Sequence, residues 1–74
     1  MPGSVYKVIE LVGTSTESWE AAARQALEAA AKNLHDLRVA EVVTLDVRLK
    51  DNKIVEYRAK MKVSFKYHEE LGDS

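Results

Sequence analysis

Cysteine is absent from this sequence of 74 residues, and the absence removes several classes of protein at once. Without cysteine the chain has no disulfide framework, no thiolate metal site and no cysteine nucleophile. A chain free of cysteine also fits a reducing compartment. The location that we expect is therefore the cytoplasm.

Long hydrophobic runs and an excess of one charge are absent as well. No apolar stretch approaches the roughly 18 to 20 residues of a membrane-spanning helix, and residues 1–4 show no signal-peptide pattern. The 11 basic and 12 acidic residues leave a net charge of −1, so the chain has no global attraction to nucleic acid or anionic lipid. We expect neither nucleic acid nor membrane as a partner.

Aromatic residues are scarce, with one Trp, one Phe and three Tyr in the whole chain. A domain of about this length buries only about 60% of the surface that its unfolded chain exposes. Such a domain usually needs a disulfide, a metal or partner subunits to be stable. Since a disulfide is excluded, oligomerisation is the simplest remaining source of stability.

The first half of the chain predicts a strand followed by a helix. Residues Val5–Val12 (VYKVIELV) are rich in β-branched side chains, which is typical of a strand. From about Glu17 to Leu34, apolar residues recur at every third or fourth position, which predicts an amphipathic helix. Thr14 or Ser15 is placed to cap its first turn, and Thr14 with Glu17 has capping-box spacing.

The second half alternates apolar and polar residues, which predicts a long antiparallel hairpin with one apolar and one polar face. Matching polar positions across the hairpin places Lys50 opposite Ile54 and leaves residues 51–53 as a three-residue loop. The same register also brings opposite charges together, which the hydrophobic pattern does not require. The two pairs are Arg48 with Glu56 and Asp46 with Arg58.

The predicted fold class is α+β with element order β-α-β-β, in which one helix packs on a three-stranded antiparallel sheet. We expect one domain over residues 1–74, with an ordered core of about 5–67 and a polar tail at 68–74. The helix would span about 27 Å and the hairpin strands about 40 Å. The apolar sheet face therefore outruns its cover, and such patches mark interfaces. We expect an obligate homo-oligomer.

Charged side chains offer two further interpretations. A basic stripe follows one face of the last strand, but Tyr57 and Phe65 alternate onto the other face, so the stripe lacks the rings that stack bases. We interpret it as a solvated face: Arg58, Lys60, Lys62 and Lys66. Carboxylates are also plentiful, and copies around a symmetry axis would supply the six to eight oxygens that Ca²⁺ takes. Ordinary charged surface is the alternative.

Four segments together resemble the dodecin family: YKVIELVGTS (6–15), the alanine-rich helix, DLRVAEV (36–42) and EYRAKMKVSF (56–65). The resemblance runs from about Val5 to Tyr67. It implies a hollow homododecamer of cubic 23 symmetry, no enzymatic activity, and storage or buffering of a ligand. Flavin is the best-known ligand of the family, held in pairs near two-fold axes by a stacking Trp and a hydrogen-bonding Gln.

The sequence departs from the flavin-binding pattern at both of these positions. Val39 stands where the pattern has the Trp, and Arg58 stands where it has the Gln. Loss of a stacking ring removes about 1 to 3 kcal/mol, and an arginine donates hydrogen bonds but accepts none. The resemblance implies an equivalent pocket formed by Val39, Arg58, Glu41 and Asp46. Tight flavin binding is therefore not expected.

The sequence is also similar to a dodecin subgroup described as calcium-binding, which shares the Leu-Arg-Val-Ala turn and the Ser-Trp-Glu helix start. The resemblance implies Glu10, Glu20 and Asp46 as candidate metal ligands. We hypothesise a non-enzymatic dodecameric shell that binds a divalent cation such as calcium rather than flavin. The alternatives are a flavin-storing dodecin and a ligand-free structural oligomer. The basic stripe also leaves coenzyme A open as a larger anionic ligand.

Overall fold

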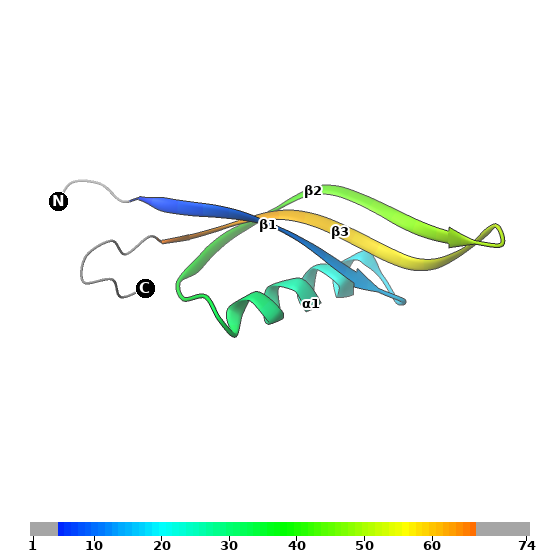
Figure 1. The fold of residues 1–74 in the computed structure, drawn as a ribbon, viewed down its shortest axis with the longest axis horizontal. Coiled ribbons are helices and arrows are strands. Elements are labelled where there is room, and N and C mark those ends of the chain that lie inside the picture. Colours follow the sequence, from blue (N-terminus) through cyan, green and yellow to red (C-terminus); the bar gives the residue numbers. More distant parts are fainter. Residues whose placement is uncertain (1–4, 67–74) are drawn as a thin grey trace.

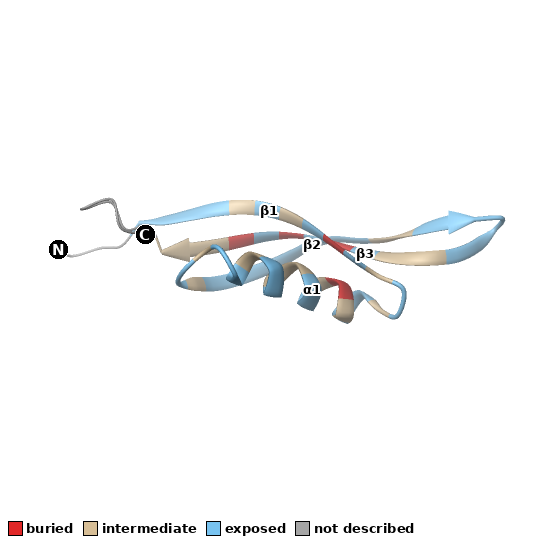
Figure 2. Ribbon diagram, turned by 60° about the horizontal axis from the view of Figure 1, so that its bottom comes forward, coloured by how far each residue is buried: buried red, intermediate tan, exposed pale blue. Residues whose placement is uncertain are grey.

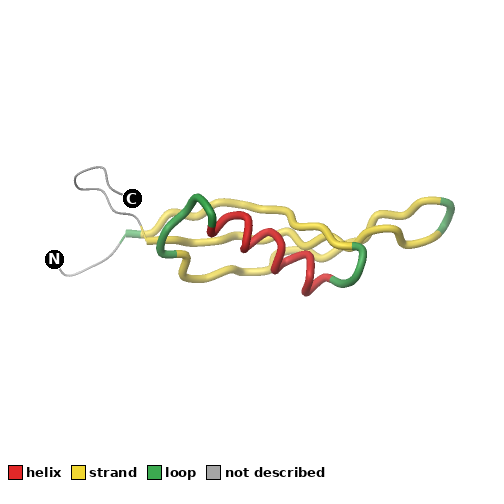
Figure 3. The backbone as a smooth tube through the Cα atoms, turned by 90° about the horizontal axis from the view of Figure 1, so that it is seen from below, coloured by secondary structure: helices red, strands yellow, loops and turns green. Residues whose placement is uncertain are grey.

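The computed structural model describes residues 5–66, which form β1 (Tyr6–Ser15), α1 (Trp19–Ala31), β2 (Leu37–Lys50) and β3 (Lys53–Lys66). The strands make one antiparallel sheet in the order β1-β3-β2, so β3 lies in the middle. The helix runs along one face of this sheet (Figure 1, Figure 3). The predicted α+β fold, β-α-β-β, is confirmed. Tyr67 and the predicted tail at 68–74 lie outside the described residues.

Strand β1 runs three residues further than predicted, because residues 13–15 continue to pair with β3. Gly13 is buried against the helix in this extension. A Cβ atom at Gly13 would overlap the backbone oxygen of Ala22 and lie 2.9 Å from the Cβ of Ala26. Only glycine allows β1 and α1 to approach so closely.

Helix α1 is shorter than the predicted range 17–34, and it is capped by a different residue. The hydroxyl of Ser18 accepts a hydrogen bond from the backbone N–H of Ala21 at 3.0 Å, which makes Ser18 the N-cap. Thr14 and Ser15 belong to β1 instead, so the predicted capping box was wrong. Within the described part of the chain, no helix has the length and apolarity needed to cross a membrane.

The turn between β2 and β3 is tighter than predicted. Asp51 and Asn52 alone form it, with φ angles of 54° and 64°. Two successive positive φ angles are the geometry of a type I′ turn, and Asp and Asn tolerate it better than most residues. Lys50 consequently pairs with Lys53 rather than with Ile54, and the predicted three-residue loop was wrong.

A register shift beside the turn restores the predicted pairing. Leu49 pairs with Ile54 and Arg48 pairs with Glu56, so Val55 is an extra residue on β3. The ion pair predicted for Arg48 and Glu56 is confirmed, with 3.0 Å between Nε and Oε1. The bulge therefore cancels the one-residue error in the turn, and the rest of the predicted hairpin register is kept as far as Thr44, which pairs with Lys60.

The core of the single chain is small. Its fully buried apolar residues, among those described, are Ala22, Ala59, Met61 and Val63, whereas eleven large hydrophobic side chains are exposed. The Cα radius of gyration is 15.2 Å, against about 11 Å for a compact domain of this length. Figure 2 shows the buried residues on the sheet and near the start of α1, with mostly exposed residues towards the hairpin turn.

Trp19 marks the point where the helix stops covering the sheet. Its indole Nε1–H donates a hydrogen bond to the backbone oxygen of Asp46 at 3.0 Å, and its ring meets Tyr57 edge-on at 5.1 Å. Beyond Trp19 the hairpin continues without the helix (Figure 1). Leu49 is 60% exposed there and Ile54 is 52% exposed. The predicted excess of apolar surface over its cover is confirmed.

Candidate ligand and cation site

The face of the sheet turned away from α1, called the outer face below, carries the charged side chains of β3. The residues of β3 that alternate with the buried ones are exposed or partly exposed, and Tyr57 and Phe65 alternate onto the helix side. The predicted basic stripe thus lies on the outer face without a β3 ring beside it. Its members are Arg58, Lys60, Lys62 and Lys66.

Carboxylates on the two neighbouring strands neutralise part of the positive charge of this stripe. In the observed register Lys62 lies between Glu10 of β1 and Glu41 of β2, and Arg58 lies beside Asp46. The outer face is therefore a pattern of alternating charges rather than a uniform cationic surface.

Asp46 and Arg58 form a two-fold hydrogen-bonded ion pair across the hairpin. The guanidinium Nε and Nη2 donate to Oδ1 and Oδ2 at 2.7 and 2.9 Å. This confirms the predicted pair. The hydrogen bonds from Arg58 lower the pKa of Asp46 below its ordinary value, and Asp46 raises the pKa of Arg58. Both carboxylate oxygens of Asp46 are thus engaged.

A small hollow of about 190 Å³ opens beside this pair, lined by Val12, Asp46, Arg58 and Lys60. The strand neighbours of Lys60 are Val12 and Thr44, neither of which is charged. A metal ion in the hollow would face two cationic side chains and a carboxylate that is already bound. Asp46 is therefore poorly placed to hold a metal within one protomer.

Val39, the other position that distinguishes this chain from the flavin-binding pattern, lies at the far end of the outer face. It is 63% exposed and pairs with Ser64, whose hydroxyl donates to the Val39 carbonyl oxygen at 3.4 Å. Ser64 and Arg58 are six residues apart on β3, or about 20 Å. Val39 and Arg58 cannot line one pocket in a single protomer, and Glu41 lies between them. A shared pocket requires a second copy.

The three carboxylates predicted as metal ligands lie on three different elements. Glu10 is on β1 and Asp46 on β2, whereas Glu20 is on α1 and accepts a hydrogen bond from Arg24 at 3.2 Å. Among residues 5–66, no three His, Cys, Asp or Glu side chains are grouped so that they could hold a metal ion. The predicted set therefore does not converge within one protomer.

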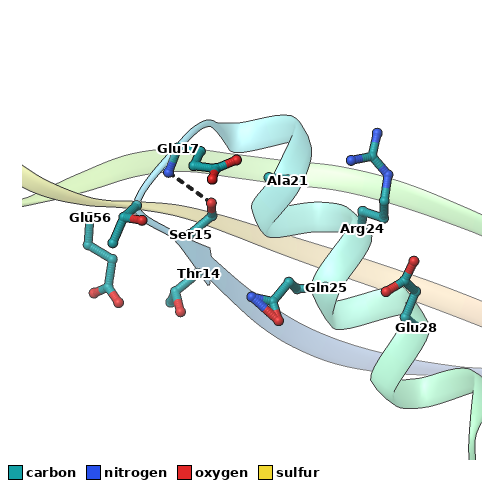
Figure 4. Close-up of a pocket in the computed structure, with 9 residues that line it drawn as sticks. Thr14, Ser15, Glu17, Ala21, Arg24, Gln25, Glu28 and Glu56 are labelled. Carbon is teal, nitrogen blue, oxygen red and sulfur yellow. Dashed lines mark hydrogen bonds between the residues drawn. The ribbon is translucent and has the colours of Figure 1, made fainter.

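A larger hollow of about 440 Å³, named the acidic groove below, lies between the end of β1 and the first turns of α1 (Figure 4). Its polar lining offers hydroxyl, amide and carboxylate oxygens, with a single guanidinium. These residues are Thr14, Ser15, Thr16, Glu17, Arg24, Gln25, Glu28 and Glu56. Such oxygens are the ligands that hard cations prefer, and the excess of carboxylates favours cations over anions.

The acidic groove could not be predicted from the sequence, for a physical reason. Its carboxylates come from a loop, from α1 and from β3, and β1 was expected to end before Thr14. A signal was nevertheless present, because Arg24, Gln25 and Glu28 recur at helical spacing and form one polar face. This face becomes one wall of a groove only because β1 extends far enough to form the opposite wall.

Comparison with known proteins identifies the family. A dodecin family model matches residues 5–68. The chain is 46% identical over 63 residues to the calcium dodecin of Mycobacterium tuberculosis, covering 85% of this chain and 89% of that one. It is 40% identical over 67 residues to the dodecin of Thermus thermophilus, covering 90% and 97%.

Two solved structures have the same fold. The M. tuberculosis calcium dodecin, described as calcium chelating with a novel calcium-binding site, superposes with a TM-score of 0.80 at 41% identity, covering 95% of this chain and all of that one. The dodecin of Streptomyces coelicolor gives a TM-score of 0.87 at 29% identity, covering 93% and 99%. Sequence and fold agree over nearly the whole chain, which therefore belongs to the dodecin family.

Proposed function

We propose that this chain forms a hollow homododecameric shell that binds or stores a small ligand and catalyses no reaction. Dodecamers are known for dodecins, which are small binding or storage proteins. The small core supports the assembly, since the large exposed side chains would gain burial only in contact with other copies. The cytoplasmic location expected from the cysteine-free sequence is part of the same proposal.

A divalent cation such as calcium is a better candidate ligand for this shell than flavin. The observation that carries this preference is the ion pair of Arg58 with Asp46 at the position where a flavin-binding member has an amide. The guanidinium has no acceptor for a flavin edge, and Val39 has no ring to stack on it. The similarity to a calcium dodecin supports the same preference.

The cation ligands that we propose come from more than one copy of the chain, because Ca²⁺ takes more oxygens than one protomer gathers. Glu10 is the first candidate, since its carboxylate forms no ion pair with any other residue of the described range 5–66. Glu20 and Asp46 are the other two, and each would first have to release the arginine that it holds. The acidic groove is a second place where a cation would be attracted.

Calorimetric titration of EDTA-treated protein with calcium chloride, together with riboflavin titration followed by fluorescence, tests the proposal. We expect saturable calcium binding that Glu10→Gln weakens, and no submicromolar quenching of riboflavin. Asp51→Asn, which removes one carboxylate at the hairpin turn, is the matched control and should bind calcium as the wild type does. Submicromolar riboflavin binding without calcium binding would reverse the preference.

A ligand-free structural oligomer is the second candidate. It is favoured by the same ion pair, because Arg58 and Asp46 satisfy each other where a ligand would otherwise be held. An intact shell that binds neither calcium nor riboflavin would select this candidate over the first.

A further inference from the structure

Helix α1 has an apolar groove on its side, named the helix groove below. Its floor is formed by Ala23, Leu27, Ala31 and Leu37, and it is a shallow, open hollow of about 500 Å³. The first three residues follow one another at steps of four, so they form one row along the helix. Since alanines flank Leu27 on both sides, the groove has room for branched side chains from outside.

The end of the hairpin, residues 49–54 and named the hairpin tip below, is a second exposed apolar surface. Leu49 and Ile54 pair across the strands, so their side chains lie together, and both are more than half exposed. Lys50 and Lys53 form the next pair and flank the turn on either side. Figure 1 shows the hairpin tip projecting beyond both α1 and β1.

The two surfaces carry opposite charges. The rim of the helix groove is formed by Glu20, Arg24 and Glu28. Arg24 is bound to Glu20 at 3.2 Å, so the carboxylate of Glu28 is the one left over, and the rim has a net charge of −1. The hairpin tip has two lysines and one aspartate, which give it a net charge of +1.

We propose that the hairpin tip of one copy packs into the helix groove of the next copy. Two hairpin tips facing each other would bring four lysines together, and two helix grooves would bring their glutamates together. Only the unlike pair joins an apolar surface to an apolar surface and a cationic rim to an anionic one. Leu49 and Ile54 enter beside Leu27, and Lys50 or Lys53 reaches Glu28.

This contact deepens the proposed shell and rests on it. A contact between two different surfaces of identical chains is head-to-tail, and it closes into a ring when the rotation between copies allows. A ring of three is compatible with the three-fold axes of a cubic shell. In such a ring the helix groove and the hairpin tip of each chain are both covered by neighbouring chains.

A charge exchange tests the contact. Lys50→Glu combined with Lys53→Glu reverses the hairpin tip, and Glu28→Lys reverses the rim. We expect each change to reduce the fraction of chains that sediment as the shell, and the chain carrying all three changes to recover that fraction. Lys60→Glu, on the outer face, is the charge-reversal control for the rescue. Any loss of the shell fraction that it causes should not be recovered when Glu28→Lys is added. Reversals that leave the shell intact, or a loss without recovery, overturn the proposal.

Cross-linking provides a second measurement that does not depend on charge. The chain contains no cysteine, so an equimolar mixture of Ala23→Cys chains and Leu49→Cys chains can be assembled and then oxidised. We expect disulfide-linked pairs containing one chain of each kind, and few pairs of identical chains. An intact shell without mixed pairs overturns the contact but not the shell, whereas a monomeric wild type overturns both.

Discussion

Asp46 is held from two sides by two different parts of the chain. Its backbone oxygen accepts the indole N–H of Trp19 at 3.0 Å, and its carboxylate binds Arg58 at 2.7 and 2.9 Å. One residue of β2 thus ties the start of the helix to the outer face of the sheet. Changes at Trp19 or Arg58 are expected to affect the same strand.

The hydrogen bond of Trp19 can be separated from its ring contact. Trp19→Phe keeps an aromatic ring beside Tyr57 but removes the donor to the Asp46 oxygen. We expect a loss of about 0.5 to 1.5 kcal/mol in the free energy of unfolding, measured by urea denaturation at fixed protein concentration. Tyr57→Leu removes the ring contact and leaves the N–H donor. Its effect on the free energy of unfolding should therefore be independent of the effect of Trp19→Phe. Equal stability of Trp19→Phe and wild type would show that this hydrogen bond contributes nothing.

Acid should weaken the link between β2 and β3. Hydrogen bonds from Arg58 lower the pKa of Asp46 in the folded chain below its ordinary value of 3.8. The ion pair therefore stabilises the fold above about pH 3.8, and this stability is lost as the pH falls further through the lowered pKa. Asp46→Asn should remove this part of the acid dependence, as followed by urea midpoints between pH 6 and pH 2. Asp51→Asn should retain it, and an unchanged dependence in Asp46→Asn would contradict the assignment.

The close approach of β1 and α1 should make Gly13 intolerant of any side chain. In Gly13→Ala the new methyl group would overlap the backbone of Ala22, so helix and strand must separate. We expect a loss of about 1 to 3 kcal/mol, typical of overpacking. Thr14→Ala, at the neighbouring exposed position, is the control and should cost less. Wild-type stability of Gly13→Ala would mean that the helix moves aside at no cost.

The helix cap provides a direct comparison between two serines. Ser18→Ala removes the hydroxyl that accepts the Ala21 N–H and should cost about 1 kcal/mol. Ser15→Ala removes only a hydrogen bond from the Glu17 N–H in the loop and should cost less. Thermal unfolding followed by circular dichroism ranks the two variants. A larger effect at Ser15 would favour the cap expected from sequence spacing.

The hairpin shows how far the sequence could predict the fold. Alternation and charge pairing predicted that Asp46 faces Arg58 and that Arg48 faces Glu56, because both signals are local to the strands. They could not predict that Asp51 and Asn52 make the turn alone. Parity of facing residues also fits a three-residue loop, and because of the bulge at Val55 the pairs from Arg48 to Thr44 are the same for both loop lengths.

The start of the helix was predicted wrongly for a different reason. Thr14 and Ser15 have the chemistry of a cap, but pairing with β3 keeps them in the sheet, and this pairing is a tertiary effect. The candidate metal ligands Glu10, Glu20 and Asp46 were chosen by resemblance, which says nothing of where they lie within one chain. The distance of Val39 from Arg58 likewise emerges only from the strand register.

Reversing the two departures from the flavin-binding pattern should increase the affinity for flavin. The double variant Val39→Trp with Arg58→Gln supplies a stacking ring and an amide that both donates and accepts. We expect it to bind riboflavin at least tenfold more tightly than wild type, measured by fluorescence quenching. Val39→Leu with Arg58→Gln, which supplies the amide without the ring, is the matched control. No gain in the double variant would show that other residues exclude flavin.

The apolar side of the hairpin outruns its helix, so we expect the chain to be stable only as part of a closed assembly. Sedimentation of the wild-type protein at micromolar concentration tests this most directly. A single species of about 100 kDa, twelve copies of the 8.3 kDa chain, is the predicted result. A particle of 8.3 kDa that still unfolds cooperatively would contradict it.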